Sequence, residues 1–389
     1  MEDLKIYQDK NARRDDWASV RRVVIKIGTS VVTAGTNEFS AAQVEPLVHS
    51  IARLKKERRQ VVFVSSGAVG LGAGKLKLDR ARLNDLATRQ ACAAVGQSLL
   101  MHAYEELFSK QGVPIAQVLL TEDDFTDRTR HLNVRRTIEK LLKLGVLPII
   151  NENDTVSTVE LELKADGVNR SFGDNDRLAA LVMSKLDADA LIILTSVDGL
   201  LRTSASSKNV EVVPRVTEID SDLRALANGR SATGRGGMET KLEAAEIAMR
   251  TGGLAIIANG TKPDTLDRIF AGDKLGTFFI SGARLKGKRR WIAYAAGVRG
   301  RLVVNAGARD AIVGGKASLL ASGVLRVEEQ FEASDVVSII DVDGREFARG
   351  MANCTSLEAE RLIGSGSAAA KTGRARVLVT RNNIVLIEK

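Results

Sequence analysis

The stretch VVIKIGTS, residues 23–30, introduces the pattern that decides the fold of this chain. Its first five residues are apolar apart from Lys26, which is typical of a strand that is covered on both faces. Similar short runs recur, and segments with apolar residues at helical spacing, such as 44–54, 86–108 and 242–248, lie between them. The other runs are VVFVS (61–65), IAQVLL (115–120), VLPII (146–150), ALIILT (190–195) and LAIIA (254–258). This alternation predicts an α/β fold with an open, mainly parallel sheet sandwiched by helices.

The pattern changes near residue 280. Residues 281–290 are rich in basic residues and contain glycine, and the segments after Gly297 are shorter, with turn residues between them. These segments predict a small β-rich domain with short helices at 307–314 and 356–363. We therefore divide the 389 residues into four parts. The parts are an N-terminal extension (1–20), an α/β domain (21–280), a basic linker (281–296) and the β-rich domain (297–389).

Composition excludes several classes of protein. The net charge is +9, but five of those charges lie in residues 281–290, so a general polyanion-binding surface is not supported. The only cysteines, Cys92 and Cys354, exclude a disulfide framework and a four-thiolate metal site. The first residues lack an apolar signal-peptide core, and no run reaches the roughly 18 apolar residues of a membrane helix. We expect a cytoplasmic protein with no membrane segment and no protein-bound metal.

Glycine-rich or polar loops follow several of the predicted strands. Gly28, Thr29 and Ser30 come after the first strand, where glycine lets backbone N–H groups turn toward an anion and Lys26 adds a charge. Residues 65–75 are also glycine-rich, but they fail the Walker A pattern because position 69 is Val and position 76 is Leu. This second loop remains either a structural turn or an anion cradle at a helix start.

Three further polar loops complete the set. Asn151-Glu152-Asn153-Asp154 follows a strand, at the sheet edge where open α/β sheets bind ligands. Gly173-Asp174-Asn175-Asp176 begins a helix, and it offers more polar groups than the one that an N-cap needs. Residues 234–241, GRGGMETK, combine a glycine-rich backbone, a helix start and Lys241, which suits nucleotide phosphates. A surface loop is the simpler reading of this last segment.

Taken together, these loops favour phosphoryl transfer. All of them are able to meet at one edge of the sheet, and two lysines with several helix N-termini supply positioning and charge neutralisation. The histidines, His49, His102 and His131, show neither a catalytic triad nor a metal-ligand spacing. A carboxylate acceptor explains the absence of a base, because a carboxyl group with a pKa of about 4.3 is already ionised at neutral pH.

The order of these motifs resembles that of the bacterial glutamate 5-kinases, or γ-glutamyl kinases, of the amino acid kinase superfamily. The matching motifs are KIGTS (26–30), VSSGAVGLG (64–72), INENDTV (150–156), GDND (173–176), the 233–241 loop and KRRWI (288–292). Residues 307–331 resemble the PUA domain that many members carry. The resemblance covers about residues 21–389.

The resemblance implies ATP-dependent phosphorylation of the γ-carboxylate of L-glutamate to L-glutamyl 5-phosphate, the first step of proline biosynthesis, with Mg²⁺ arriving on the nucleotide. It also implies roles for residues of this chain. Lys26 and Lys241 would bind the transferring phosphoryl group, and Asp176 would orient both lysines. The implied ATP-binding residues are Lys26, Gly28, Thr29, Ser30, Thr195, Ser196, Arg235, Gly236, Gly237, Met238, Glu239, Thr240 and Lys241. The implied glutamate-binding residues are Ser66, Gly67, Ala68, Asp154, Asp174 and Asn175.

The resemblance further implies a homo-oligomer, proline as feedback inhibitor and contact with the next enzyme, glutamate-5-semialdehyde dehydrogenase. Three departures from the family pattern affect these expectations. Ser196 stands where members often have Asp, and Arg235 stands where they have Thr. The interval from Asp154 to Gly173 is also long, and its extra segment, 161–170, is expected to form a hairpin over the site.

Other functions compete with this interpretation. Aspartokinases have a different start motif and regulatory ACT domains, and uridylate kinases lack the C-terminal domain. An RNA-binding protein is the alternative from another class, because PUA modules bind RNA elsewhere. The nearly balanced charge of the tail and an aromatic content of 4% weigh against RNA.

Overall fold

The computed structural model describes most of the chain as two compact units, of residues 1–249 with 253–282 and of residues 250–252 with 283–389. The described residues are 17, 19–79, 83, 85–121, 123–126, 128–156, 175–203, 210–227, 237–280, 292, 298–315, 317–364 and 377–387. None of the helices in these ranges is long and apolar enough to cross a membrane.

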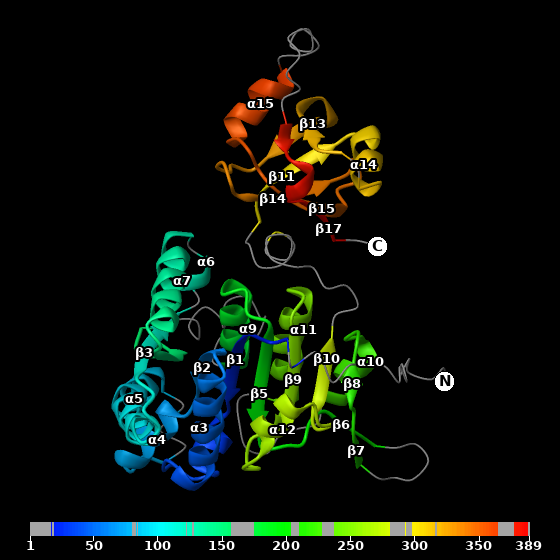
Figure 1. The fold of residues 1–389 in the computed structure, drawn as a ribbon. Coiled ribbons are helices and arrows are strands. Elements are labelled where there is room, and N and C mark those ends of the chain that lie inside the picture. The colour runs from blue at the N-terminus through cyan, green and yellow to red at the C-terminus, as the bar shows by residue number, and fades with distance from the viewer. Residues whose placement is uncertain are drawn as a thin grey trace. The chain divides into compact units, whose positions relative to one another are not determined.

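The first unit is built on an eight-stranded sheet with the order β3-β4-β2-β1-β5-β9-β10-β8 (Figure 1). All neighbouring strands run parallel except β9 and β10. The strands are β1 (Arg22–Ile27), β2 (Gln60–Ser65), β3 (Ile115–Leu120), β4 (Leu147–Glu152), β5 (Ala190–Thr195), β8 (Arg215–Val216), β9 (Leu254–Asn259) and β10 (Thr277–Ile280). The predicted open, mainly parallel sheet is confirmed.

Helices cover both faces of this sheet (Figure 1). They are α2 (Thr29–Thr33), α3 (Ala41–Lys56), α4 (Ala68–Lys75), α5 (Leu86–Ser109), α6 (Asp123–Thr126), α7 (Arg128–Lys143), α9 (Asn175–Lys185), α10 (Ser221–Ala227), α11 (Met238–Arg250) and α12 (Thr265–Ala271). Ile25 of β1 packs with α3, α5 and α12, whereas Val24 packs on the opposite face with α9 and α11. Because side chains alternate along a strand, Lys26 lies on the same face as Val24.

The glycine-rich segment after β2 forms helix α4, which the sequence left open. Gly67, with φ of 108°, makes the turn before it. A Cβ atom at Gly72 would lie 1.8 Å from the carbonyl oxygen of Cys92, and one at Gly96 would lie 1.8 Å from that of Ala68. These two glycines therefore allow the backbones of α4 and α5 to touch, so they serve helix packing.

The second unit is small and rich in strands, as predicted. Its five-stranded sheet has the order β13-β11-β14-β15-β17, beside a pair formed by β12 and β16. Helix α14 (Ala306–Val313) and helix α15 (Ser356–Gly364) match the two short helices that the sequence predicts. The strands are β11 (Val298–Val304), β12 (Leu319–Leu320), β13 (Val324–Glu328), β14 (Val336–Ile340), β15 (Glu346–Met351), β16 (Val377–Val379) and β17 (Ile384–Leu386). A separate hydrophobic core lies between these elements.

Several elements of the first unit were not predicted. Strands β6 (Leu201–Thr203) and β7 (Val210–Val212) form a separate hairpin, and β8 and β10 extend the main sheet past β9. The hairpin expected at 161–170 and most of the linker 281–296 lie outside the described residues.

Candidate active site

The carboxyl ends of the central parallel strands bring most of the predicted site residues to one edge of the sheet. Lys26 is the penultimate residue of β1, and Ile27 pairs in register with Ser65 at the end of β2. Asn151 lies near the end of β4, and Thr195 ends β5. Since parallel strands all end at the same edge, residues far apart in sequence meet here, where open α/β sheets bind ligands.

A buried carboxylate lies between two lysines at this edge. The Nζ atom of Lys26 is 2.6 Å from Oδ1 of Asp176, and the Nζ atom of Lys241 is 2.9 Å from Oδ2. Asp176 is completely buried, and the two lysines are almost completely buried. Three elements supply the group, because Lys26 comes from β1, Asp176 from the first turn of α9 and Lys241 from the first turn of α11.

The charges of this group set its chemistry. Burial alone would raise the pKa of Asp176, but the charges and hydrogen bonds of Lys26 and Lys241 outweigh burial and hold this pKa well below its usual range. The carboxylate is therefore ionised at neutral pH. Two cations against one anion leave one positive charge in excess within this group of three side chains, which suits an anionic ligand such as a phosphate.

The start of α11 holds the second lysine in place. The carbonyl oxygen of Gly237 accepts a hydrogen bond from Oγ1 of Thr240 at 3.0 Å and one from Nζ of Lys241 at 3.4 Å. Glu239 forms an ion pair with Arg224 of α10 at 3.2 Å, and Met238 begins the helix. Thr240 also reaches Asp176, at 3.4 Å. The predicted residues 237–241 therefore lie beside the lysine pair, whereas Arg235 and Gly236 lie outside the described residues.

Asn175 joins the buried lysine group to the turn after β2. Its amide nitrogen is 2.9 Å from the carbonyl oxygen of Ser65, 3.0 Å from Oγ of Ser66 and 2.9 Å from Oδ1 of Asn151. The amide oxygen of Asn175 is buried and has no hydrogen-bond partner among the described residues. A buried acceptor without a partner is costly, so this oxygen is suited to accept from a ligand.

The remaining predicted residues surround these groups. Gly67 and Ala68 form the turn into α4 beside Ser66. The N–H of Gly28 donates to the carbonyl oxygen of Leu194, so this amide does not face a phosphate. A Cβ atom at Gly28 would lie 3.8 Å from Nζ of Lys26 and 3.9 Å from Oγ of Ser30, so the glycine leaves the space between them open.

The other positions are more peripheral. Thr29 and Ser30 open α2, Thr195 is buried, and Ser196 is exposed just after β5. Asp154 lies in the turn after β4, and Asp174 lies outside the described residues.

Sequence reasoning missed two polar side chains that support this edge, Gln97 and Tyr104. Gln97 accepts a hydrogen bond from Asn151 at 2.8 Å, and the hydroxyl of Tyr104 is 2.6 Å from Oγ of Ser65. Asn151 was placed near the site as part of its polar cluster, but it was given no role. The signal for the other two is their spacing, because residues seven apart lie on the same face of α5.

The described residues hold no cluster of three or more His, Cys, Asp or Glu side chains that would bind a metal ion. Among the described residues at this sheet edge, two carboxylates are buried: Asp176, which is already paired with two lysines, and Glu152, which ends β4. This donor set does not form a protein cage for Mg²⁺, which usually keeps several waters and binds substrate phosphates.

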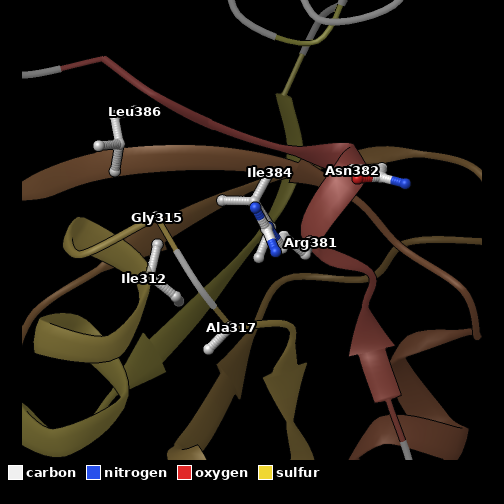
Figure 2. A pocket seen from close by; sticks show the side chains of 7 residues that line it. All are labelled: Ile312, Gly315, Ala317, Arg381, Asn382, Ile384 and Leu386. Atoms are coloured by element: carbon white, nitrogen blue, oxygen red, sulfur yellow. The ribbon is translucent and has the colours of Figure 1, made fainter.

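A hollow of about 290 Å³ lies in the second unit (Figure 2). Aliphatic side chains such as Ile312 and Ile384 line it, and Arg381 is the one charged residue of its lining. Figure 2 shows Arg381 beside Ile384, opposite Ala317. One cation gives this hollow far less capacity for phosphate chemistry than the group formed by Lys26, Asp176 and Lys241.

Comparison with known proteins agrees with this geometry. Residues 21–259 match the model of the amino acid kinase family, and residues 300–373 match that of the PUA domain. A glutamate 5-kinase of Caldanaerobacter subterraneus subsp. tengcongensis is 43% identical, over 88% of this chain and 90% of the relative. Those of Moorella thermoacetica and Myxococcus xanthus are 43% and 44% identical, over 89% and 90% of this chain and 90% and 91% of the relatives. The chain therefore belongs to the amino acid kinase family, among the glutamate 5-kinases, and carries a PUA domain.

Proposed function

We propose that this chain transfers the γ-phosphoryl group of ATP to the γ-carboxylate of L-glutamate, which gives L-glutamyl 5-phosphate and ADP. This reaction is the first step of proline biosynthesis from glutamate. The observation that carries the proposal is the buried group of Lys26, Asp176 and Lys241 next to the open amide oxygen of Asn175. An excess positive charge beside a polar substrate pocket is what phosphoryl transfer to a carboxylate needs.

The chemistry follows from these charges. A γ-carboxylate oxygen forms a bond to the γ-phosphorus of ATP, the bond from that phosphorus to the bridging oxygen breaks, and ADP leaves with the electron pair. The acceptor is already ionised, so no general base is required. Lys26 and Lys241 neutralise the charge that moves between the oxygens, and Asp176 directs both ammonium groups.

The two substrates take opposite sides of the lysine pair in this proposal. ATP lies along Gly28, Thr29, Ser30, Thr195, Ser196 and residues 235–241. Glutamate lies against Ser66, Gly67, Ala68, Asp154, Asp174 and Asn175. The α-ammonium group of glutamate only donates hydrogen bonds, so it suits the unpartnered oxygen of Asn175. Mg²⁺ is supplied with the nucleotide, where it shields phosphate charge.

The same proposal extends to organisation and regulation. The kinase domain spans residues 21–280, after the extension 1–20, and the linker 281–296 leads to the PUA domain at 297–389. We expect a homo-oligomer in the cytoplasm, inhibited by proline and working beside glutamate-5-semialdehyde dehydrogenase, and we expect no RNA ligand for the PUA domain. A filter-binding assay with structured RNA tests the last point.

Trapping of the acyl phosphate tests the reaction directly. The protein is incubated with ATP, Mg²⁺, glutamate and hydroxylamine, and the hydroxamate is measured, with aspartate, N-acetylglutamate and UMP as competing acceptors. We expect product from glutamate. Product from another acceptor with none from glutamate would overturn the proposed function.

Substitution of the glutamate-binding residues should raise the KM for glutamate. Asn175→Ala and Asp154→Ala each remove a polar partner, which costs about 1–3 kcal/mol and corresponds to a rise in KM of roughly 5- to 150-fold. Steady-state kinetics with each substrate varied in turn checks this. The KM for ATP is the internal control, and a rise in that constant alone would mean that the two substrate sites are assigned the wrong way round.

Removal of the C-terminal unit tests the domain boundaries. A chain that stops after Arg290 should remain folded and active, because every proposed ligand precedes residue 242 and the first unit has its own hydrophobic cores. We expect changes in the response to proline or in the Mg²⁺ requirement, with turnover kept within about threefold, since the missing unit supplies no proposed ligand. Size-exclusion chromatography and the hydroxamate assay check this. A folded truncation that is inactive at saturating substrates would contradict the modular division.

A further inference from the structure

Three amide side chains form a chain of hydrogen bonds that ends at the open oxygen of Asn175. Gln97 of α5 accepts from Nδ2 of Asn151 at 2.8 Å, and Oδ1 of Asn151 accepts from Nδ2 of Asn175 at 2.9 Å. Oδ1 of Asn151 also accepts from the backbone N–H of Glu152 at 2.9 Å. The chain therefore runs from a helix on one face of the sheet to the carboxyl edge of its strands.

The direction of each amide in this chain is set by groups that have only one role. The carbonyl oxygen of Ser65 only accepts, so the group of Asn175 that faces it must be the nitrogen. The N–H of Glu152 only donates, so the group of Asn151 that faces it must be the oxygen. The nitrogen of Asn151 must then find an acceptor elsewhere, and Oε1 of Gln97 is that acceptor.

The backbone of α5 at Gln97 is packed tightly against the turn between β2 and α4, which contains Ser66, Gly67 and Ala68. The residue before it, Gly96, lies so close to α4 that a Cβ atom there would be 1.8 Å from the carbonyl oxygen of Ala68. One face of α5 thus touches the start of α4 and also carries Gln97 to Asn151 and Tyr104 to Ser65. A shift of Gln97 relative to the pocket would require the two helices to separate.

We propose that Gln97 is a positioning residue for glutamate, which acts through Asn151 to hold the amide oxygen of Asn175 toward the α-ammonium group of the substrate. The inference rests on the proposed function. Gln97 touches neither substrate in this assignment. Its effect is to anchor the side chain of Asn151, and through it that of Asn175, at the position from which the buried oxygen faces the ligand.

Three variants separate this role from a general structural one. Gln97→Leu removes the acceptor at similar volume, and Gln97→Glu keeps an acceptor oxygen. Gln117→Leu makes the same substitution of glutamine by leucine at an exposed position of β3, so it is the matched control. For Gln97→Leu we expect a KM for glutamate about tenfold higher, from the loss of one hydrogen bond, with kcat and the KM for ATP within about twofold. For Gln97→Glu and Gln117→Leu, the KM for glutamate should stay within about threefold of that of the unsubstituted protein.

A second measurement addresses the ammonium group itself. Glutarate has both carboxylates of glutamate but no α-ammonium, so its inhibition constant should be the same in the unsubstituted protein and in Gln97→Leu. Calorimetric binding of glutamate without ATP should weaken by the same factor as the KM. Equal weakening of glutamate and glutarate, or an unchanged KM for glutamate, would overturn the proposal. If Gln97→Leu does not fold, Gln97→Asn, which shortens the side chain by one carbon, is measured against the same expectations.

The unsubstituted protein separates this inference from the proposed function. If it gives no hydroxamate from glutamate, the proposed function fails before any variant is made. If it turns glutamate over and Gln97→Leu behaves identically, only the role of Gln97 is wrong.

Discussion

Replacing Lys26 or Lys241 by alanine should lower kcat by about 10²–10³ with a much smaller change in the KM for glutamate. Each lysine carries a charge that is worth most when negative charge shifts between the donor and acceptor oxygens. Loss of one preorganised donor of this kind typically costs roughly 3–4 kcal/mol of transition-state stabilisation. The two lysines contact different oxygens of the Asp176 carboxylate, so each ammonium group is held at its own position and neither is able to take over the role of the other.

The lysine variants should still fold, which makes their kinetics interpretable. Removal of one lysine leaves Asp176 paired with the other lysine, so the buried carboxylate is not left without an ion-pair partner. Hydroxamate formation at saturating substrates gives kcat, and the melting temperature checks the fold. Lys75→Ala, at an exposed position in the last turn of α4, is the matched control, and its kcat and melting temperature should be close to those of the unsubstituted protein. Turnover near normal in Lys26→Ala or Lys241→Ala would remove that residue from the proposed machinery.

The sequence predicted the sheet well because most of its strands, namely β1, β2, β4, β5 and β9, are buried on both faces. All six predicted apolar runs are strands of the first unit, since a continuous run of β-branched residues has few other stable environments. Strands such as β8 and β10 were missed because they are short and lie at the end of the sheet, where neighbours decide the structure more than the local pattern does. Helix α4 was left open because three of its eight residues are glycine, and one of these, Gly72, lets α5 approach.

The site could be predicted only in part. Residues next to a strand end or a helix start, such as Lys26 and Asp176, can be placed from sequence because topology alone brings strand ends together. Gln97 sits in the middle of a long helix, with no motif around it. Its contact with Asn151 depends on the approach of α5 to α4 through Gly96, which is a packing property that no local pattern reveals.

Asp176→Asn should be the most destabilising of the single substitutions at the site. The side chain is completely buried, and its removal leaves Lys26 and Lys241 facing each other without the carboxylate between them. Loss of one partner from a buried ion pair costs about 3–5 kcal/mol, because the remaining charge is neither solvated nor paired. We also expect kcat to fall by at least about 10², since both ammonium groups lose the partner that directs them.

The pH dependence of this effect has a definite sign. The pKa of Asp176 is held well below the value of about 3.9 that the side chain has in an unfolded chain. Its ionised form therefore stabilises the fold fully above that value, and the contribution is lost as the pH falls below it. Unfolding in urea at a series of pH values should show a constant gap between the unsubstituted protein and Asp176→Asn down to about pH 5, and a narrowing gap below about pH 4.

A second aspartate shows why burial decides the size of the effect. Asp198 also pairs with a lysine, Lys262, at 2.7 Å, and its pKa is lowered by the hydrogen bond from that lysine. Its side chain is about half exposed, so water replaces the lost partner and Asp198→Asn should change the free energy of unfolding by less than about 1 kcal/mol. If the two variants lose similar stability, or if the Asp176→Asn gap is the same at pH 3 and pH 7, the buried carboxylate does not hold the two lysines in the way that the distances indicate.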